Sequence, residues 1–374
     1  MTRYFATVAR SLEPIAALEL ERLGAQEVVA DFAGVHFQGD LALLYRVNLW
    51  ARTIFRVLVP LKEFRCVDAQ MLYQGVQQID WREYLTPDDT IAVRSTGGNR
   101  QLNHSHYSAL QVKNAIVDQQ RQQFGRRSSV DAETPTVAIN LHIHRDRGIL
   151  SLDSSGTSLH RRGYRPVVGL APLKETLAAA LLELAEYSPS LPFLDPLCGS
   201  GTLPLEASLK ALNIAPGSFR EEFAFMKWSD FDRQLWQQIE AEAVAARRST
   251  LPAPIYGSDR DAEAIASAHL NAKNCGVEGL IQLMQQDVSQ IEAPGSEGIL
   301  ICNPPYGERL GNARELGDFY KLLGDIFKQR FKGWTAFVLT GNKELAKRVG
   351  LRASRRIPVY NGALPCTLLK YELY

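Results

Sequence analysis

The stretch FLDPLCGSGT, residues 193–202, decides the fold class of this 374-residue chain. Phe193 to Asp195 is typical of the end of a buried strand, and residues 203–212 continue as a helix. Gly199 and Gly201 let the backbone turn sharply between them and approach a ligand closely. Because doubly wound α/β sheets bind ligands at the carboxyl ends of their strands, this turn predicts such a sheet with a ligand at its edge.

The residues of this loop also limit the ligand. The loop lacks the lysine of nucleoside-triphosphate loops and the three-glycine spacing of dinucleotide loops. The Asp195 carboxylate would repel an anionic pyrophosphate, and it favours a cationic ligand such as the methionine end of S-adenosylmethionine. An ordinary tight turn is the structural alternative. The loop residues predicted to bind this cofactor are Asp195, Pro196, Cys198, Gly199, Gly201 and Thr202.

Acidic residues follow the next two predicted strands. Asp259 comes after the strand at 255–257 and is placed to accept hydrogen bonds from ribose hydroxyls. Asp261, two residues later, is predicted to cap the following helix. Asp287 follows the strand at 281–284. The sequence favours two roles for it equally: a contact with the adenine amino group, or the cap of a turn.

The motif ICNPPYG, residues 301–307, predicts the chemistry most sharply. Pro304 and Pro305 fix the backbone and remove two N–H donors, which leaves carbonyl groups free to accept. The Asn303 side-chain oxygen and the Pro304 carbonyl can both accept from an exocyclic amino group, while Tyr306 stacks on the base. Asn303 is also expected to touch the cofactor. Orientation then carries the transfer without a strong base, although a rigid turn remains the structural alternative.

The rest of the chain divides into two halves of different character. Strands and helices alternate from residue 173 to 339, which predicts a doubly wound, mostly parallel sheet. Two antiparallel strands, 355–360 and 366–371, are expected at its edge. The first 158 residues instead read as two small α+β units, and the basic connector HRRGYRP, 160–166, marks the boundary.

Composition excludes several classes of protein. The N-terminus lacks a secretory signal and no apolar run is long enough to cross a membrane, so a soluble, cytoplasmic protein is expected. The five widely spaced cysteines support neither disulfides nor zinc. His104 and His106 lack further matched ligands, so no metal is predicted. Residues 94–165 carry eleven Lys/Arg against five Asp/Glu, which suits phosphate contact or a solvated surface.

Together, DPLCGSGT (195–202) and NPPYGER (303–309) resemble class I amino-methyltransferases that act on nucleic-acid bases. The chain resembles most the guanine-N2 RNA methyltransferases with a THUMP domain, in particular the large-subunit rRNA guanine-N2 methyltransferase L family in its single-enzyme form. Further matching segments are LHRRGYRP (159–166), APLKETLAAALL (171–182), GSDRDAEAI (257–265), NGALPCTLL (361–369) and AVRSTGGNRQLNHSHYSALQVKNAIVD (92–118).

This resemblance implies three parts: a ferredoxin-like subdomain at 1–60, a THUMP-like RNA-binding domain at 61–158 and a Rossmann-like methyltransferase domain at 159–374. The N-terminal parts would bind a folded RNA. The methyltransferase part is expected to fold alone. The implied phosphate contacts are Arg94, Arg100, Lys113, Arg161 and Arg165. The three connector arginines, Arg161, Arg162 and Arg165, could equally pair with acids.

The function expected from the resemblance is methylation of a guanine N2 in 23S rRNA, with S-adenosyl-L-methionine as cofactor. Three alternatives stay open: guanine-N2 methylation of tRNA, adenine-N6 methylation, and an RNA-binding assembly factor with a vestigial transferase fold. Phe225, Trp228 and Trp236, in an insertion between the first two strands of the sheet, are expected in the core rather than stacked on bases.

Overall fold

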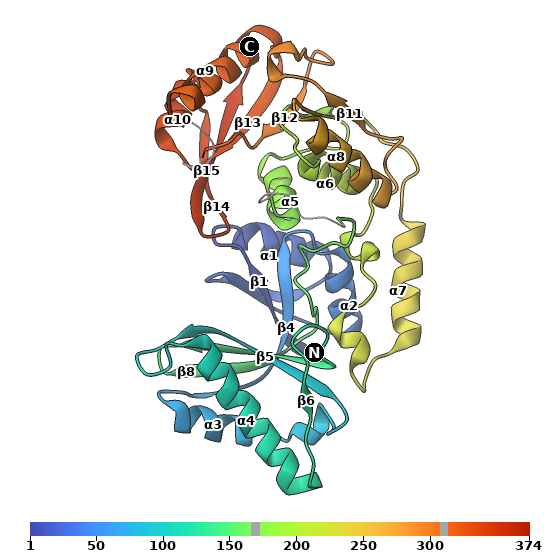
Figure 1. Ribbon diagram of the computed structural model, residues 1–374. Coiled ribbons are helices and arrows are strands. Elements are labelled where there is room, and N and C mark those ends of the chain that lie inside the picture. Colours follow the sequence, from blue (N-terminus) through green and yellow to red (C-terminus); the bar gives the residue numbers. More distant parts are fainter. Residues whose placement is uncertain (166–172, 307–312) are drawn as a thin grey trace.

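The computed structural model describes residues 1–165, 173–306 and 313–374. Within these residues the chain forms an eight-stranded sheet in the N-terminal half and a seven-stranded sheet in the C-terminal half (Figure 1). Parts of three predicted motifs, residues 166, 171–172 and 307–309, lie outside the described residues.

The N-terminal sheet has the strand order β2-β3-β1-β4-β8-β7-β5-β6. Its strands are β1 (Thr2–Val8), β2 (Gln26–Asp31), β3 (Gly34–Gly39), β4 (Ile54–Arg65), β5 (Thr90–Gly98), β6 (Ser129–Val130), β7 (Val137–His144) and β8 (Arg147–Asp153). Most neighbours are antiparallel, but β5 runs parallel to β6 and β7. Its helices are α1 (Glu13–Arg22), α2 (Leu41–Trp50), α3 (Ala69–Gln77) and α4 (Ser105–Phe124).

The twelve-residue strand β4 joins the two N-terminal units into one sheet. Its first half pairs with β1, and from Leu58 onward it pairs with β8. The register shifts between Pro60 and Lys62, because proline cannot donate a hydrogen bond to the ladder. The expected boundary at residue 60 therefore falls inside a shared strand.

The C-terminal sheet has the order β11-β10-β9-β12-β13-β15-β14. The first five strands are mutually parallel, and β15 and β14 add an antiparallel edge, as the sequence predicts. Its strands are β9 (Phe193–Asp195), β10 (Ile255–Asp259), β11 (Gln282–Gln285), β12 (Gly298–Cys302), β13 (Trp334–Thr340), β14 (Arg355–Asn361) and β15 (Leu364–Glu372). Its helices are α5 (Glu175–Leu184), α6 (Thr202–Ala211), α7 (Arg233–Ala245), α8 (Ala262–Asn274), α9 (Ala313–Arg330) and α10 (Lys343–Arg348).

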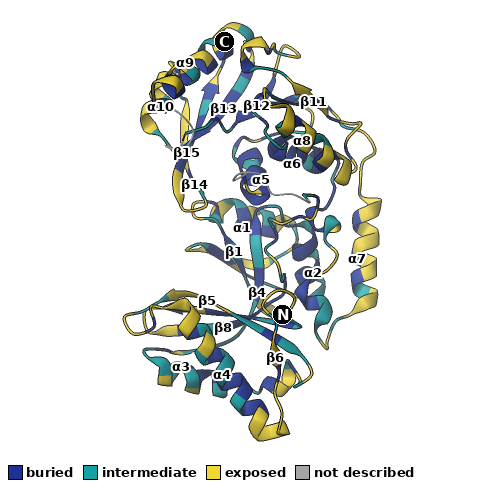
Figure 2. Cartoon of the chain, in the orientation of Figure 1, coloured by how far each residue is buried: buried dark blue, intermediate teal, exposed yellow. Residues whose placement is uncertain are grey.

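Helix α5 lies between the two halves and is buried along most of its length (Figure 2). Its sequence is apolar on nearly every side, which is typical of a helix covered all round. A single apolar core runs from Leu20 and Tyr45 in the N-terminal half to Leu181 and Trp236 in the C-terminal half. The methyltransferase part therefore shares its apolar core with the N-terminal part, and its folding alone stays a prediction.

The aromatic insertion forms part of this shared core, as predicted for Phe225 and Trp236. Phe225 stacks on Tyr45 with ring centroids 4.4 Å apart, and Trp236 meets the same Tyr45 ring edge-on. Trp228 is partly buried against this core. The insertion thus fastens α2 of the N-terminal half to the methyltransferase part.

Candidate active site

The glycine loop lies at the carboxyl end of β9, the central strand between β10 and β12. Asp195 is 2% exposed, and its Oδ1 accepts a hydrogen bond from the Leu197 N–H at 3.1 Å. Gly199 and Gly201 have φ of +52° and +84°, in the left-handed region that glycine adopts without strain. A Cβ on Gly199 would meet nothing within 4 Å, so the loop borders open space at this position.

Asp259, at the end of β10, holds this loop in place. Its Oδ2 accepts from the Gly199 N–H at 2.9 Å, and its Oδ1 accepts from the Asp261 N–H at 3.0 Å. A carboxylate has further lone pairs, so Asp259 can still accept from ribose hydroxyls. Asp261 caps α8 by accepting from the Glu263 N–H, as predicted.

The acids of the loop favour a cationic ligand. Burial raises the pKa of Asp195 well above its ordinary value, and the nearby charge of Asp259 raises it further. Burial also raises the pKa of the Cys198 thiol, with Asp195 as the next cause. A bound cation would stabilise the ionised Asp195, so the residues present fit the methionine end of S-adenosylmethionine.

Asp287 caps the short turn that follows β11. Its Oδ1 accepts from the N–H and the hydroxyl of Ser289, at 2.9 Å and 2.6 Å. These bonds lower the pKa of Asp287. Asp287 therefore caps this turn, and its contact with adenine stays a prediction.

Asn303 follows β12 and carries a buried oxygen without a partner. Its Oδ1 makes no hydrogen bond to any of the described residues. Leaving such a buried acceptor unsatisfied costs roughly 1–3 kcal/mol, which a ligand N–H would recover. Pro304, the next residue, is buried, and its ring fixes the backbone at this point.

Tyr306 is held by the hairpin of β14 and β15. Its hydroxyl oxygen accepts from the Asn361 side-chain N–H at 2.8 Å and from the Cys366 thiol at 3.6 Å. Burial raises the pKa of Tyr306 to about 12, so the phenol stays protonated at neutral pH. Asn361 and Cys366 lie in the matching segment NGALPCTLL, 361–369, but no local sequence pattern indicates that they bind Tyr306.

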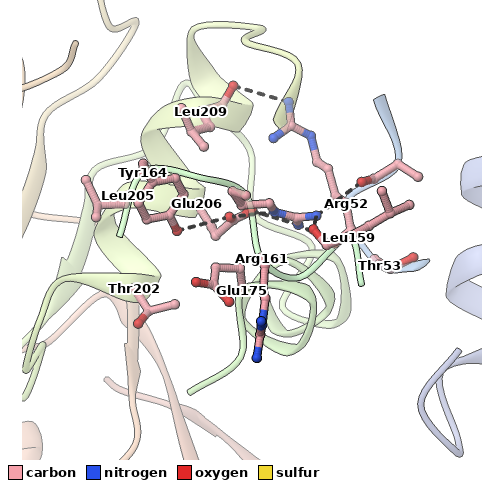
Figure 3. A network of polar contacts seen from close by, with 12 residues as sticks. Arg52, Thr53, Leu159, Arg161, Tyr164, Glu175, Thr202, Leu205, Glu206 and Leu209 are labelled. Atoms are coloured by element: carbon pink, nitrogen blue, oxygen red, sulfur yellow. Dashed lines mark hydrogen bonds and ion pairs between the residues drawn. The ribbon is translucent and has the colours of Figure 1, made fainter. Parts of the chain in front are cut away.

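Arg162 and Arg165 of the connector are buried in ion pairs. Their acidic partners Glu206 and Glu175 are labelled in Figure 3. Arg162 pairs with Glu206 of α6 at 3.2 Å, and both side chains are almost unexposed. Arg165 pairs with Glu175 at 3.3 Å and donates to the Thr202 hydroxyl beside the glycine loop. Because its side chain is only 9% exposed, Arg165 fits the ion-pair alternative and does not fit a phosphate contact.

Of the remaining predicted RNA contacts, Arg94 in β5 and Arg161 in the connector are both exposed. Partial burial lowers the pKa of Arg94, the charges of Arg56 and Arg161 lower it further, and the charge of Asp153 opposes them. A cavity of about 80 Å³, away from the glycine loop, is lined by Arg94 and Lys227. Arg100 follows β5, and Lys113 belongs to α4, which lies at the opposite end of the molecule from the methyltransferase sheet (Figure 1).

Two further observations concern metals and membranes. The ring of His104 caps α4 by accepting from the Tyr107 N–H at 3.3 Å, and the described residues contain no group of three or more potential metal ligands. In the same part of the chain, no helix combines the length and apolarity needed to span a bilayer.

Comparison with known families places the chain. Residues 162–370 match the profile of the RMKL-like methyltransferase domain. The chain belongs to this RMKL-like methyltransferase family. Residues 66–153 match the THUMP domain, and residues 3–58 match the RlmL ferredoxin-like domain. The predicted family relationship and fold class are confirmed.

Several relatives match almost the whole RMKL-like chain. A Synechocystis sp. protein, described as a candidate RNA methyltransferase, is 59% identical over 371 residues, covering 99% of this chain and 97% of that protein. The ribosomal RNA large subunit methyltransferases K/L of Syntrophotalea carbinolica and Methylococcus capsulatus are each 43% identical, covering 99% and 100% of this chain. The chain spans only about half of these K/L proteins, 53% and 52% of their lengths.

Solved structures share the complete arrangement. A methyltransferase candidate complexed with S-adenosylhomocysteine is 31% identical with a TM-score of 0.89, covering 100% of this chain and 98% of that one. A protein from Listeria monocytogenes, described as a predicted N6-adenine-specific DNA methylase, is 32% identical with a TM-score of 0.88, covering 100% and 96%. The cofactor of this RMKL-like methyltransferase is S-adenosylmethionine, as the glycine loop predicts.

Proposed function

We propose that this RMKL-like methyltransferase methylates the exocyclic N2 of a guanine in 23S rRNA, in the cytoplasm. The buried Oδ1 of Asn303, which lacks a partner among the described residues, carries the chemical part of this proposal. An exocyclic amino group is the kind of donor that this oxygen lacks. It would arrive at the carboxyl end of β12, next to the glycine loop of β9.

The residues of the site would divide the work. When bound, S-adenosylmethionine supplies the electrophilic methyl group. Asp195, Asp259 and Asp287, together with Pro196, Cys198, Gly199, Gly201 and Thr202, would hold it. The Asn303 oxygen and the Pro304 carbonyl would accept the two amino hydrogens and so aim the nitrogen lone pair at the methyl group.

Tyr306 would stack on the guanine while Pro305 stiffens the approach to it. The raised pKa of Tyr306 argues against a role for the phenol as a base at neutral pH. The amine proton would leave to water after the new N–C bond has formed. Orientation, rather than prior deprotonation, would therefore supply most of the rate acceleration.

We further propose three functional parts, 1–60, 61–158 and 159–374, of which the first two hold the RNA. Arg94 and Arg161 support this, because no acid among the described residues forms an ion pair with either. The like charges of Arg94 and Arg161 repel each other, and a bound phosphate would offset that repulsion. Arg100 and Lys113 would contact more distant phosphates.

The choice of large-subunit rRNA is supported by the names of the K/L relatives, and the THUMP match supports RNA over DNA. Adenine-N6 methylation is the main rival, because the same Asn-Pro-Pro-Tyr arrangement serves an adenine amino group and the Listeria protein is described in those terms. Guanine-N2 methylation of tRNA is the second rival.

Labelled methyl transfer separates these reactions. The full chain is incubated with labelled S-adenosylmethionine and, separately, large-subunit rRNA, tRNA and DNA from a strain lacking the protein, and the products are digested to nucleosides. We expect label in N2-methylguanosine from large-subunit rRNA. Label in N6-methyladenosine alone would refute the guanine assignment, and label in tRNA alone would refute the rRNA assignment.

A further inference from the structure

The hairpin of β14 and β15 reaches from the methyltransferase sheet to the N-terminal half (Figure 1). Its tip pairs Asn361 with Leu364, and Val359 pairs with Cys366 two residues further inward. The Arg10 guanidinium, from the N-terminal half, lies 6.0 Å from the centre of the Tyr360 ring at this tip. The segment that carries Asn361 is therefore in contact with both halves of the protein.

The same tip holds Tyr306 by its hydroxyl oxygen. Asn361 and Cys366 occupy this oxygen with two donors, at 2.8 Å and 3.6 Å. A phenolic oxygen has two lone pairs, so both accepting positions are used. The ring of Tyr306 can therefore not leave its position without losing the hydrogen bonds from Asn361 and Cys366.

The other side of the Tyr306 ring is limited by Gly341, just after β13. A Cβ on Gly341 would lie 3.0 Å from both Cδ2 and Cε2 of the ring. That distance is shorter than ordinary van der Waals contact, so a larger residue at 341 would displace the ring by a few tenths of an ångström. Gly341 and the hairpin thus confine the ring from two directions.

We propose that Asn361 is a positioning residue for methyl transfer: through the hydroxyl of Tyr306 it fixes the ring against which the target base stacks. This proposal rests on the proposed function, which gives Tyr306 its stacking role. A base whose amino group is a fraction of an ångström out of line with the methyl group is methylated more slowly, even when the RNA is bound equally well. Asn361 therefore acts on the transfer step and not on the binding of RNA or cofactor.

The test is a double-mutant cycle of Asn361→Ala and Tyr306→Phe in the full chain, with Gly341→Ala as an independent displacement of the ring. Asn361→Ala should lower kcat roughly fivefold, the effect of one lost hydrogen bond. Tyr306→Phe should lower kcat at least as much, because it also removes the bond to Cys366. Gly341→Ala should lower kcat by displacing the ring. The KM for RNA and the calorimetric Kd of S-adenosylmethionine should stay near wild type. The double variant should be no slower than Tyr306→Phe alone, because Tyr306→Phe already removes the bond to Asn361.

Two controls make the outcome decisive. Arg355→Ala changes an exposed ion pair at the other end of β14 and should leave kcat unchanged. Nucleoside analysis of the same reactions tests the proposed function separately, since a product other than N2-methylguanosine would refute that function and leave the cycle interpretable. The positioning role is refuted if the effects of the two single variants multiply, or if Gly341→Ala and Asn361→Ala both leave kcat at the wild-type value.

Discussion

Arg162 of the linker and Glu206 of α6 form an ion pair in which Nε and Oε1 are 3.2 Å apart and the side chains are only 1% and 0% exposed. Arg162 also donates to the backbone oxygens of Ala51, at 3.3 Å, and Arg52, both before β4. The helix that carries Glu206 begins at Thr202, directly after the glycine loop. One buried network therefore ties the N-terminal half to the helix behind the cofactor loop (Figure 3).

Replacing Glu206 should destabilise the whole protein strongly. Glu206→Ala leaves the Arg162 charge buried without its partner, which typically costs about 3–5 kcal/mol. The free energy of unfolding in urea measures this loss. The matched control is Glu186→Ala, which breaks the exposed pair with Arg355 and should cost less than about 1 kcal/mol. Equal losses in the two variants would contradict the structural role of the buried pair.

Replacing Asp195 should separate stability from cofactor binding. Its folded-state pKa is raised, so the native state holds its proton more tightly than the unfolded state, and this residue lowers stability as pH rises through that pKa. Asp195→Asn should therefore raise the melting temperature of the cofactor-free protein at neutral pH.

The same variant should bind S-adenosylmethionine roughly tenfold to a hundredfold more weakly, because a charged partner is lost. In the wild type, affinity should fall as pH falls through the raised pKa of Asp195, above the ordinary carboxylate range near pH 4. Calorimetry across this range measures both effects. Wild-type affinity in Asp195→Asn would show that this carboxylate does not meet the cofactor.

Asn303→Ala should slow methyl transfer by about a hundredfold to a thousandfold, the usual effect of losing one transition-state hydrogen bond. Cofactor affinity should change little, because the lost contact is to the amine. Single-turnover rates and calorimetry report the two quantities. A collapse of cofactor affinity would instead assign Asn303 to the cofactor.

Arg94→Ala together with Arg161→Ala should weaken binding to folded RNA and reduce its salt dependence. Two lost phosphate contacts lower the slope of log affinity against log salt by about two. Binding titrations at several salt concentrations measure the slope. Arg126→Ala is the matched control, because this exposed arginine already pairs with Asp88. An unchanged slope in the double variant would remove Arg94 and Arg161 from the RNA interface.

The methyltransferase sheet could be predicted because its signals are local. The glycine loop and the Asn-Pro-Pro-Tyr motif are each contained in a segment of ten residues or fewer, 193–202 and 301–307. The sequence does not indicate strand β4, because Pro60 and several charged residues interrupt its apolar pattern, whereas the neighbouring strands β1 and β8 stabilise it.

Other features depend on contacts between residues that are far apart in the sequence, so the sequence does not predict them. The sequence does not distinguish Arg162 from the exposed Arg161, because the partner Glu206 is 44 residues away. Asn361 meets Tyr306 across 55 residues, so no local pattern indicates its role. The core shared by the two halves depends in the same way on how the halves pack and not on any one segment.

The most direct test of the central claim is the N2-methylguanosine content of large-subunit rRNA from a strain that lacks the protein. We expect one N2-methylguanosine position to be lost, and to return with the wild-type gene but not with Asn303→Ala. An unchanged N2-methylguanosine content, or a loss confined to N6-methyladenosine, would contradict the account.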